Sequence, residues 1–560
     1  MGAASSPDSS PAPQIRSIRL LFSLSFLLPR GRSFPLSLHL GSLALITSHL
    51  SSTATPTIAV TMLEHHDTKV APNMENSSTD KVDYEKTVSL HEDASQEVFD
   101  EGATKRLLRK MDVKLLPFLA LLYLLSFLDR TNIGNAKLAG LEEALGMTGK
   151  WDYNIAVAVF FPFYVAAEIP SNMAMKRFRP SIWIPSIMVA WAICTTLMGI
   201  THNFAGFLAS RMALGLAEGG LFPGITYYIT LWYKRHECGL RMAIFFSAAT
   251  AAGAFGGLFA RGVMEMDGVG GLDGWAWIFI IEGLLTMVFA VMAFFVMHDY
   301  PDTAKFLNDS ERKEVVRRLE EDRSVLSDAF DIKFAKDALK DWKIWVHMLI
   351  TIGIYTPLYS ISIFLPTIVK SLGYTAEVAQ LMTVPPYVVA CLFTIGGGFA
   401  ADKHGQRGLY MIGFCVVAMI GFIILATVDS HGAKYFGAFL ICSGIYPNVP
   451  QGVAWNGNNI GGSLKRGVGI AMHVGFGNLG GAVSGFVYRK DDAPNYRSGH
   501  WTLVGTTAMS CALSICMTLY LRRENARRDQ THKAPHEYTR AEKELEQNSG
   551  DNATFFRYTV

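Results

Sequence analysis

Residues 115–134 read LLPFLALLYLLSFLDRTNIG, an apolar run that ends with an acid and a base. From Leu115 to Leu128 no residue carries a charge. The hydrocarbon core of a bilayer is about 30 Å thick and needs about 20 predominantly apolar residues in helical form. This run therefore predicts a transmembrane helix with two ionisable residues, Asp129 and Arg130, inside it.

The same pattern recurs along the chain. The runs are too long and too uniformly apolar for barrel strands, whose side chains alternate between apolar and polar. We therefore expect an all-α membrane protein with twelve transmembrane helices. The predicted spans are 115–135, 153–175, 182–200, 206–232, 241–264, 276–298, 345–369, 378–400, 408–428, 435–455, 466–487 and 501–521.

Composition excludes several other classes of protein. Of 560 residues, 50% are hydrophobic and 18% are charged, against about 25% charged in soluble domains. The 50 Lys and Arg nearly balance the 48 Asp and Glu, so no nucleic-acid partner is indicated. The chain has no G-x-x-x-x-G-K-[ST] loop and no H-E-x-x-H motif. We expect no enzyme activity, no cofactor and no metal.

A long polar stretch divides the predicted spans into six plus six. Residues 105–298 form the N-terminal half, 299–344 a cytosolic loop with charges at helical spacing, and 345–522 the C-terminal half. Two pseudo-symmetric halves are typical of a duplicated transporter. Lys and Arg gather before the first span and in the even-numbered loops, which predicts cytosolic termini. Regions 1–104 and 523–560 are expected to be disordered, and 1–61 to be an extension of the gene model.

Four ionisable residues lie at membrane depth and are functional candidates, because a charge there costs about 2.5–3.5 kcal/mol on insertion scales. Arg211 and Glu218 are seven residues apart, so they share one helical face. A guanidinium offers a carboxylate two parallel hydrogen bonds. We therefore assign Arg130 and Arg211 to an anionic substrate, and Asp129 and Glu218 to proton coupling.

Other residues in the spans carry weaker signals. Tyr164 and Asn478 are expected to line the substrate cavity. Glu168, which precedes Ile-Pro-Ser-Asn, is equally compatible with a functional and a structural role. Glu282 is expected to form a structural pair.

Seven motifs, taken together, resemble the fungal anion:cation symporters (allantoate and nicotinate permease-like) of the major facilitator superfamily. The resemblance covers about residues 105–525. The motifs are LDRTNIG at 128–134, EIPSN at 168–172, the stretch 211–224 ending in LFPG, LWYKR at 231–235, YPDTAKFL at 300–307, IFLPT at 363–367 with SLGY at 371–374, and GNLGG at 477–481.

The resemblance implies the twelve-helix fold and the same roles for the four membrane-depth charges. The stretch from Gly398 to Arg407 is similar to the superfamily's signature in the loop between spans eight and nine. It implies that Asp402, Lys403 and Arg407 act in gating. The equivalent loop between spans two and three lacks the Asp and Gly of that signature, which weakens the same assignment there.

The sequence thus predicts a proton-coupled importer of a small organic anion, such as nicotinate or allantoate, that works by alternating access. The alternatives are an exporter of an acidic secondary metabolite and a membrane sensor without transport. We expect a monomer whose partners are the anion, protons and the lipid bilayer. The plasma membrane is the expected location, with the vacuolar membrane as the alternative.

Overall fold

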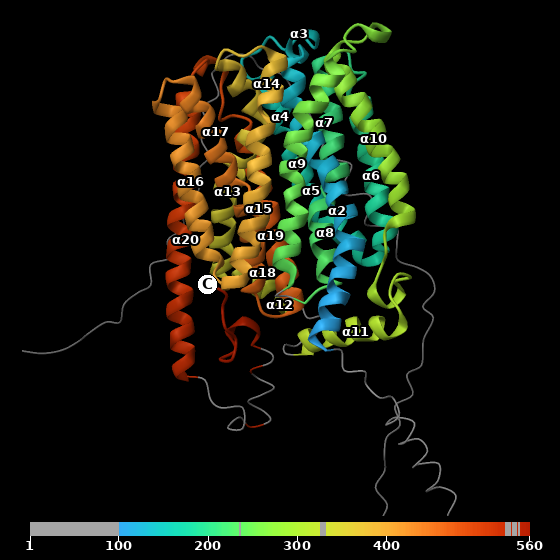
Figure 1. Ribbon diagram of the computed structural model, residues 1–560, viewed down its shortest axis with the longest axis vertical. Helices are drawn as coiled ribbons and strands as arrows, with labels where there is room; N and C mark the ends of the chain where they lie inside the picture. Colours follow the sequence, from blue (N-terminus) through green and yellow to red (C-terminus); the bar gives the residue numbers. More distant parts are fainter. Residues whose placement is uncertain (1–99, 235–236, 325–331, 532–538, 540–545, 547–548) are drawn as a thin grey trace, which may run out of the picture. The chain divides into compact units, whose positions relative to one another are not determined.

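The computed structural model describes residues 100–234, 237–324, 332–531, 539, 546 and 549–560 (Figure 1). Every regular element within these ranges is helical, which confirms the predicted all-α class. The predictions for 1–61 and for nearly all of 1–104 lie outside the described residues.

A first set of helices, here called the N-terminal group, corresponds to the first six predicted spans. It begins with α2, whose N-cap Asp100 accepts a hydrogen bond from Ala103. Gly219 and Gly220 separate α7 from α8 within a single predicted span. The group comprises α2 (Glu101–Leu138), α3 (Leu141–Ala144), α4 (Asp152–Ala158), α5 (Phe160–Arg177), α6 (Pro180–Met198), α7 (Phe204–Glu218), α8 (Leu221–Thr230), α9 (Cys238–Met264), η2 (Val269–Gly271) and α10 (Gly274–Val296).

The C-terminal group corresponds to the last six predicted spans. Tyr446 and Pro447 separate α17 from α18, where the proline cannot donate a backbone hydrogen bond. The group comprises α13 (Trp342–Ser371), α14 (Ala376–Met382), α15 (Val384–His404), α16 (Arg407–Thr427), α17 (His431–Ile445), α18 (Asn448–Asn458), α19 (Ser463–Ser484), η4 (Lys490–Asp492) and α20 (Arg497–Thr531).

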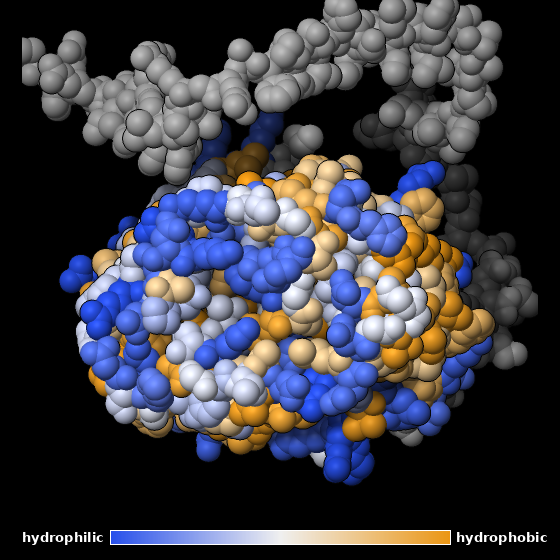
Figure 2. Space-filling model, turned by 90° about the horizontal axis from the view of Figure 1, so that it is seen from above, coloured by the Kyte–Doolittle hydropathy of each residue, from blue (hydrophilic) through white to orange (hydrophobic). Residues whose placement is uncertain are grey.

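All twelve predicted spans coincide with helices. In the described residues, nine helices are long and apolar enough to cross a membrane. The other three predicted spans correspond to α7 with α8, to α17 with α18, and to α19. Large hydrophobic side chains are exposed on several helices, as lipid contact requires; they include Ile169, Val288, Phe295 and Leu392. In Figure 2 hydrophobic residues cover the flank of the molecule, and hydrophilic residues gather on the end that faces the viewer.

The two groups meet mainly where α9 packs against α15 (Figure 1). Helix α2 also contacts α13, α5 contacts α19, and α9 contacts α14 and α18. The backbones of α2 and α13 approach so closely that a β-carbon at Gly134 would collide with the carbonyl of Ile363. Asn154 donates to the carbonyl oxygens of Gly485 (2.5 Å) and Tyr488 (3.1 Å). These contacts bring opposite faces of the groups together around a buried polar centre.

The segment that joins the groups is partly helical, as its charge spacing predicts. It contains η3 (Pro301–Thr303), α11 (Asp309–Ser324) and α12 (Ile332–Lys340). Ion pairs connect α11 to the N-terminal group: Lys110 Nζ lies 2.6 Å from Glu311 Oε2, and Arg318 pairs with Glu237. The carboxylate of Glu314 is also buried. This linker helix therefore packs against the bundle on one side.

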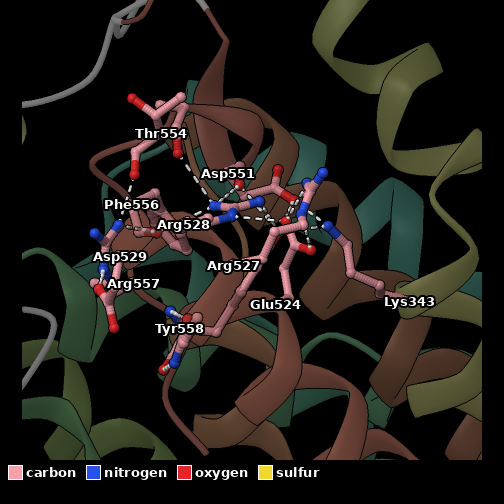
Figure 3. Close-up of polar contacts among 12 residues, drawn as sticks. Lys343, Glu524, Arg527, Arg528, Asp529, Asp551, Thr554, Phe556, Arg557 and Tyr558 are labelled. Carbon is pink, nitrogen blue, oxygen red and sulfur yellow. Dashed lines mark hydrogen bonds and ion pairs between the residues drawn. The ribbon is translucent and has the colours of Figure 1, made fainter. Parts of the chain in front are cut away.

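Parts of 523–560 are ordered, which differs from the expected disorder. Helix α20 continues to Thr531, and residues 549–560, which include η5 (Gly550–Asn552), pack against the C-terminal group. Asp551 forms an ion pair of 2.5 Å with Lys343 (Figure 3). It forms a second ion pair of 2.5 Å with Lys465. The charges that suggested a solvated tail instead pair with charges on α13 and α19. We call Asp551 and the cations that it contacts the Asp551 cluster.

Candidate functional site

Helix α2 delivers Asp129 and Arg130 to different surroundings, because neighbouring residues on a helix point about 100° apart. Arg130 lies toward the C-terminal group, where its Nη1 donates to the Tyr359 hydroxyl at 3.2 Å. Asp129 faces Trp191 and Thr195 of α6 and Glu282 of α10. Both side chains are buried. Asp129 and Arg130, although adjacent in the sequence, therefore lie in two different polar sites.

Arg130 forms a buried ion pair with Glu218 of α7. Its Nε and Nη2 atoms both lie 2.7 Å from Glu218 Oε1, and the Ser126 hydroxyl donates to the same oxygen. Glu218 Oε2 has no hydrogen-bond partner in the described residues. Arg130, which is predicted to hold the substrate, is thus neutralised by Glu218, which is predicted to carry the proton.

A chain of hydrogen bonds continues from this ion pair across the boundary between the groups. Tyr359 of α13 donates to Asn478 Oδ1 of α19 at 2.7 Å, and Asn478 in turn faces Glu168 of α5. The sequence predicts a lining role for Asn478 but indicates no specific role for Tyr359. An aromatic residue in an apolar span carries little signal, and only the fold brings Tyr359 next to Arg130.

Aromatic rings separate the two arginines. The Arg130 guanidinium lies 4.5 Å from the centre of the Tyr164 ring and 5.7 Å from that of Phe160. The Arg211 guanidinium lies 5.2 Å from the centre of the Phe160 ring. Tyr164 thus contacts a substrate candidate, as expected of a lining residue, through its ring. Its hydroxyl has no partner among the described residues.

Arg211 retains unused hydrogen-bonding capacity. Its side chain is 1% exposed, and its Nε donates to the carbonyl oxygen of Ala156 at 3.2 Å. Its Nη1 has no partner in the described part of the chain. A guanidinium has five N–H donors and no acceptor. Arg211 is therefore the cation of this centre that can bind an added anion.

Glu168 is a further buried acid at the boundary, and the sequence is compatible with either a functional or a structural role for it. It is 1% exposed, and neither carboxylate oxygen has a well-formed hydrogen bond within the described residues. A β-carbon placed on Gly475 of α19 would lie 3.4 Å from its Oε2. Three of the four predicted charges, Arg130, Arg211 and Glu218, thus share one buried centre with Glu168.

The predicted gating residues lie where α15 ends and α16 begins. Arg407 pairs with Asp402, and its Nη1 donates to Gln451 Oε1 at 2.9 Å. A β-carbon at Gly239, near the start of α9, would collide with both charged groups of this pair. The pair therefore packs directly against the N-terminal group. Lys403 is exposed and is not drawn into this contact.

The match to a known family decides the identity of this helical bundle with buried charges. Residues 119–485 match the model of the Major Facilitator Superfamily. The chain belongs to this superfamily. It is a secondary transporter of the multi-pass membrane type and not an enzyme, as the sequence predicts.

Several fungal transporters of the superfamily are similar to the chain along most of their length. The MFS-type transporter cnsO of Penicillium expansum is 35% identical over 91% of this chain and 100% of its own. The MFS transporter prlL of Fungal sp. (strain NRRL 50135) is 37% identical over 76% of this chain and 88% of its own. The narrower resemblance to anion:cation symporters stays a prediction.

Solved structures confirm the fold. A bacterial homologue of the human lysosomal transporter Spinster, in its inward-facing and unoccupied conformation, matches with a TM-score of 0.55. The match covers 72% of this chain and 96% of that chain at 16% sequence identity. At this identity the likeness concerns the superfamily fold and not the substrate.

Proposed function

We propose that this superfamily member is a proton-coupled importer of a small organic anion, such as nicotinate, allantoate or a vitamin-like carboxylate. The observation that carries the proposal is Nη1 of Arg211, which has no hydrogen-bond partner in the described residues, on a side chain that forms no ion pair there. A buried cation without a counter-ion is costly, and a carboxylate matches its planar fork with two charge-assisted hydrogen bonds. An anion is therefore the ligand that this centre is best built to accept.

Coupling to protons follows from the Arg130–Glu218 ion pair. Both guanidiniums lie against the Phe160 ring, so an anion held beside that ring competes with Glu218 for Arg130. A carboxylate at 0% exposure that loses its counter-ion is stabilised by taking up a proton. Binding of the anion and protonation of Glu218 then favour each other, so the anion and the proton are transported together.

The remaining roles follow the same scheme. Tyr164 and Asn478 line the site, and Asp129 is a second proton-binding carboxyl. Asp402 and Arg407, with Lys403 beside them, form a gate that keeps α9 against α15 and opens when the groups separate. The two groups act as the six-helix halves of an alternating-access transporter. The chain works as a monomer in the plasma membrane.

Uptake of radiolabelled nicotinate into cells that express the chain tests the proposal. We expect uptake to rise as the external medium is acidified and to collapse when a protonophore is added. Competition by a panel of unlabelled carboxylates then identifies the preferred anion. If no carboxylate in the panel is accumulated, the import of small organic anions is excluded, and export assays in inverted vesicles test the exporter alternative.

A further inference from the structure

A second buried acidic site lies inside the N-terminal group, between α2, α6 and α10. Asp129 and Glu282 face each other there, and both are 0% exposed. Asn132 Nδ2, one turn beyond Asp129 on α2, donates to Glu282 Oε2 at 2.5 Å. The sequence predicts a structural pair for Glu282, but among the described residues Glu282 forms no ion pair with a cation.

Several polar atoms around this site have no well-formed hydrogen bond in the described residues. Neither oxygen of Asp129 has a well-formed hydrogen bond in the described residues, and neither does Glu282 Oε1. Thr195 and Trp191 of α6, both 0% exposed and facing Asp129, also lack well-formed bonds for Oγ1 and Nε1. Four neighbouring buried side chains from three helices therefore have unused hydrogen-bonding capacity.

The surrounding charges do not neutralise the pair. From α7, Glu218 adds a third carboxylate, and Arg211 acts on Asp129 only at longer range. Arg130 on α2 is already occupied by Glu218. The side chains of α6 that face Asp129 are uncharged. Two adjacent carboxylates cannot both stay ionised in a low-dielectric interior without a cation between them.

We propose that Asp129 and Glu282 form one proton-binding site, in which the two carboxyls share a proton, enclosed within the N-terminal group and separate from the anion site at Arg211. The inference rests on the proposed function and deepens it, since it makes Glu282 a partner of Asp129 in carrying the proton. The proton enters from water on the side to which the transporter is open and leaves to water on the other side.

The position of the pair explains how it can influence the anion site without contacting the anion. Asp129 and Arg130 are consecutive residues of α2, so a shift of α2 that follows protonation also moves the Arg130 guanidinium relative to Glu218. Glu282 shares the proton with Asp129 and influences the anion site only through Asp129 and α2. The test needs a readout that a purely structural role would not change.

Infrared spectroscopy of the purified full chain in detergent provides such a readout without any substrate. The carbonyl stretch of a protonated carboxyl is followed as the pH is raised, in the wild type, Asp129→Asn, Glu282→Gln and the double variant. Asn and Gln are nearly isosteric with the acids, and thermal melting confirms that each variant is folded. Glu311→Gln is the control, because it removes an acid outside the pair that is held in an ion pair with Lys110.

We expect one protonated carboxyl to be lost in the double variant compared with the wild type. In each single variant the remaining acid should lose its proton at a pH lower by about one unit or more, because the like charge is gone. The control should leave this band unchanged. Acids that titrate independently of each other, or a band that responds to Na⁺ and not to pH, would overturn the proposal.

The shared proton site and the proposed import function can be refuted independently of each other. Coupled titration of Asp129 and Glu282 in a chain that transports no anion would uphold the shared proton and refute the importer. Proton-driven nicotinate uptake in a chain whose two acids titrate independently would uphold the importer and refute the shared site.

Discussion

Two clusters of buried charge in this transporter are equally hidden from solvent but differ in how completely they are paired. In the Asp551 cluster, Asp551 is 1% exposed and contacts two ammonium groups at 2.5 Å each. In the centre of the bundle, Asp129 and Glu168 are similarly buried and have no cation within bonding distance among the described residues. Burial alone therefore does not distinguish the clusters, but pairing does.

The difference suggests different roles. Arg528 completes the Asp551 cluster by donating to the backbone oxygens of Asp551 at 2.8 Å and Phe556 at 3.1 Å (Figure 3). It also donates to the backbone oxygen of Ala553 at 3.1 Å. Such a saturated network holds one conformation in place. The central acids, in contrast, have capacity left for a proton or a ligand. We interpret the first cluster as structural and the second as functional, and four predictions test this division.

The largest effect is expected at the saturated cluster. Asp551→Ala should cost about 3–5 kcal/mol of the free energy that holds residues 549–560 in place, because it leaves Lys343 and Lys465 without their shared counter-ion. Hydrogen exchange of this segment measures the loss. Asp529→Ala is the control, since its pair with Arg557 is largely exposed and is worth at most about 1 kcal/mol. Equal protection in both variants would contradict the structural role.

At Arg211, the cation in the centre of the bundle, we expect a loss of transport and not of stability. Arg211→Gln should reduce nicotinate uptake at low concentration about 100-fold, since a hydrogen bond to a charged group contributes up to about 3 kcal/mol. Lys105→Gln provides the control, because Lys105 pairs with the exposed Glu101 on the same helix. Normal uptake by Arg211→Gln would show that the anion binds elsewhere.

The same chemical change should have opposite consequences in the two clusters. Asp551→Asn removes a charge that is paired and should loosen the segment 549–560. Glu168→Gln removes a charge that has no cation partner, so the melting temperature of the protein should stay constant or rise. The two melting curves and exchange profiles are compared directly. Ordinary substitutions lower the free energy of unfolding by about 1 kcal/mol. A larger loss in Glu168→Gln would show that Glu168 has a structural role.

The mildest effect is a response of the saturated cluster to acid. Burial alone would raise the pKa of Asp551, but Lys343 and Lys465 lower it below its usual value. With a lowered pKa in the folded state, the stabilisation is complete above the unfolded pKa of about 3.9 and is lost as the pH falls through the folded value. The protection factor of the segment should be constant from about pH 7 to pH 5 and fall only below about pH 4. A loss already near pH 6 would rule out Asp551 as the group that titrates.

The sequence predicts the helices well because a membrane span is a local signal. Each of the twelve apolar runs coincides with helical residues, and the four predicted charges are all buried. The pairing of these charges was not predictable, because it depends on contacts between distant segments. The sequence alone does not indicate that Arg130 binds Glu218 while Arg211 keeps a free donor, or that Asp129 faces Glu282.

The order in residues 549–560 was missed for a related reason. A charged segment at low hydropathy is typical of disorder, and its partners Lys343 and Lys465 are about 200 and 90 residues away in the chain. Only the fold brings the cations to Asp551. Long-range ion pairs are thus the part of this structure that local patterns do not indicate.

The most direct test of the account asks whether Glu218 links the anion to the proton. Purified wild type and Glu218→Gln are reconstituted into vesicles, and two quantities are measured with labelled nicotinate: exchange at equal concentrations, and accumulation driven by a pH gradient. We expect Glu218→Gln to retain exchange and to lose accumulation, because the amide cannot carry a proton. Accumulation equal to that of the wild type would contradict the proposed coupling.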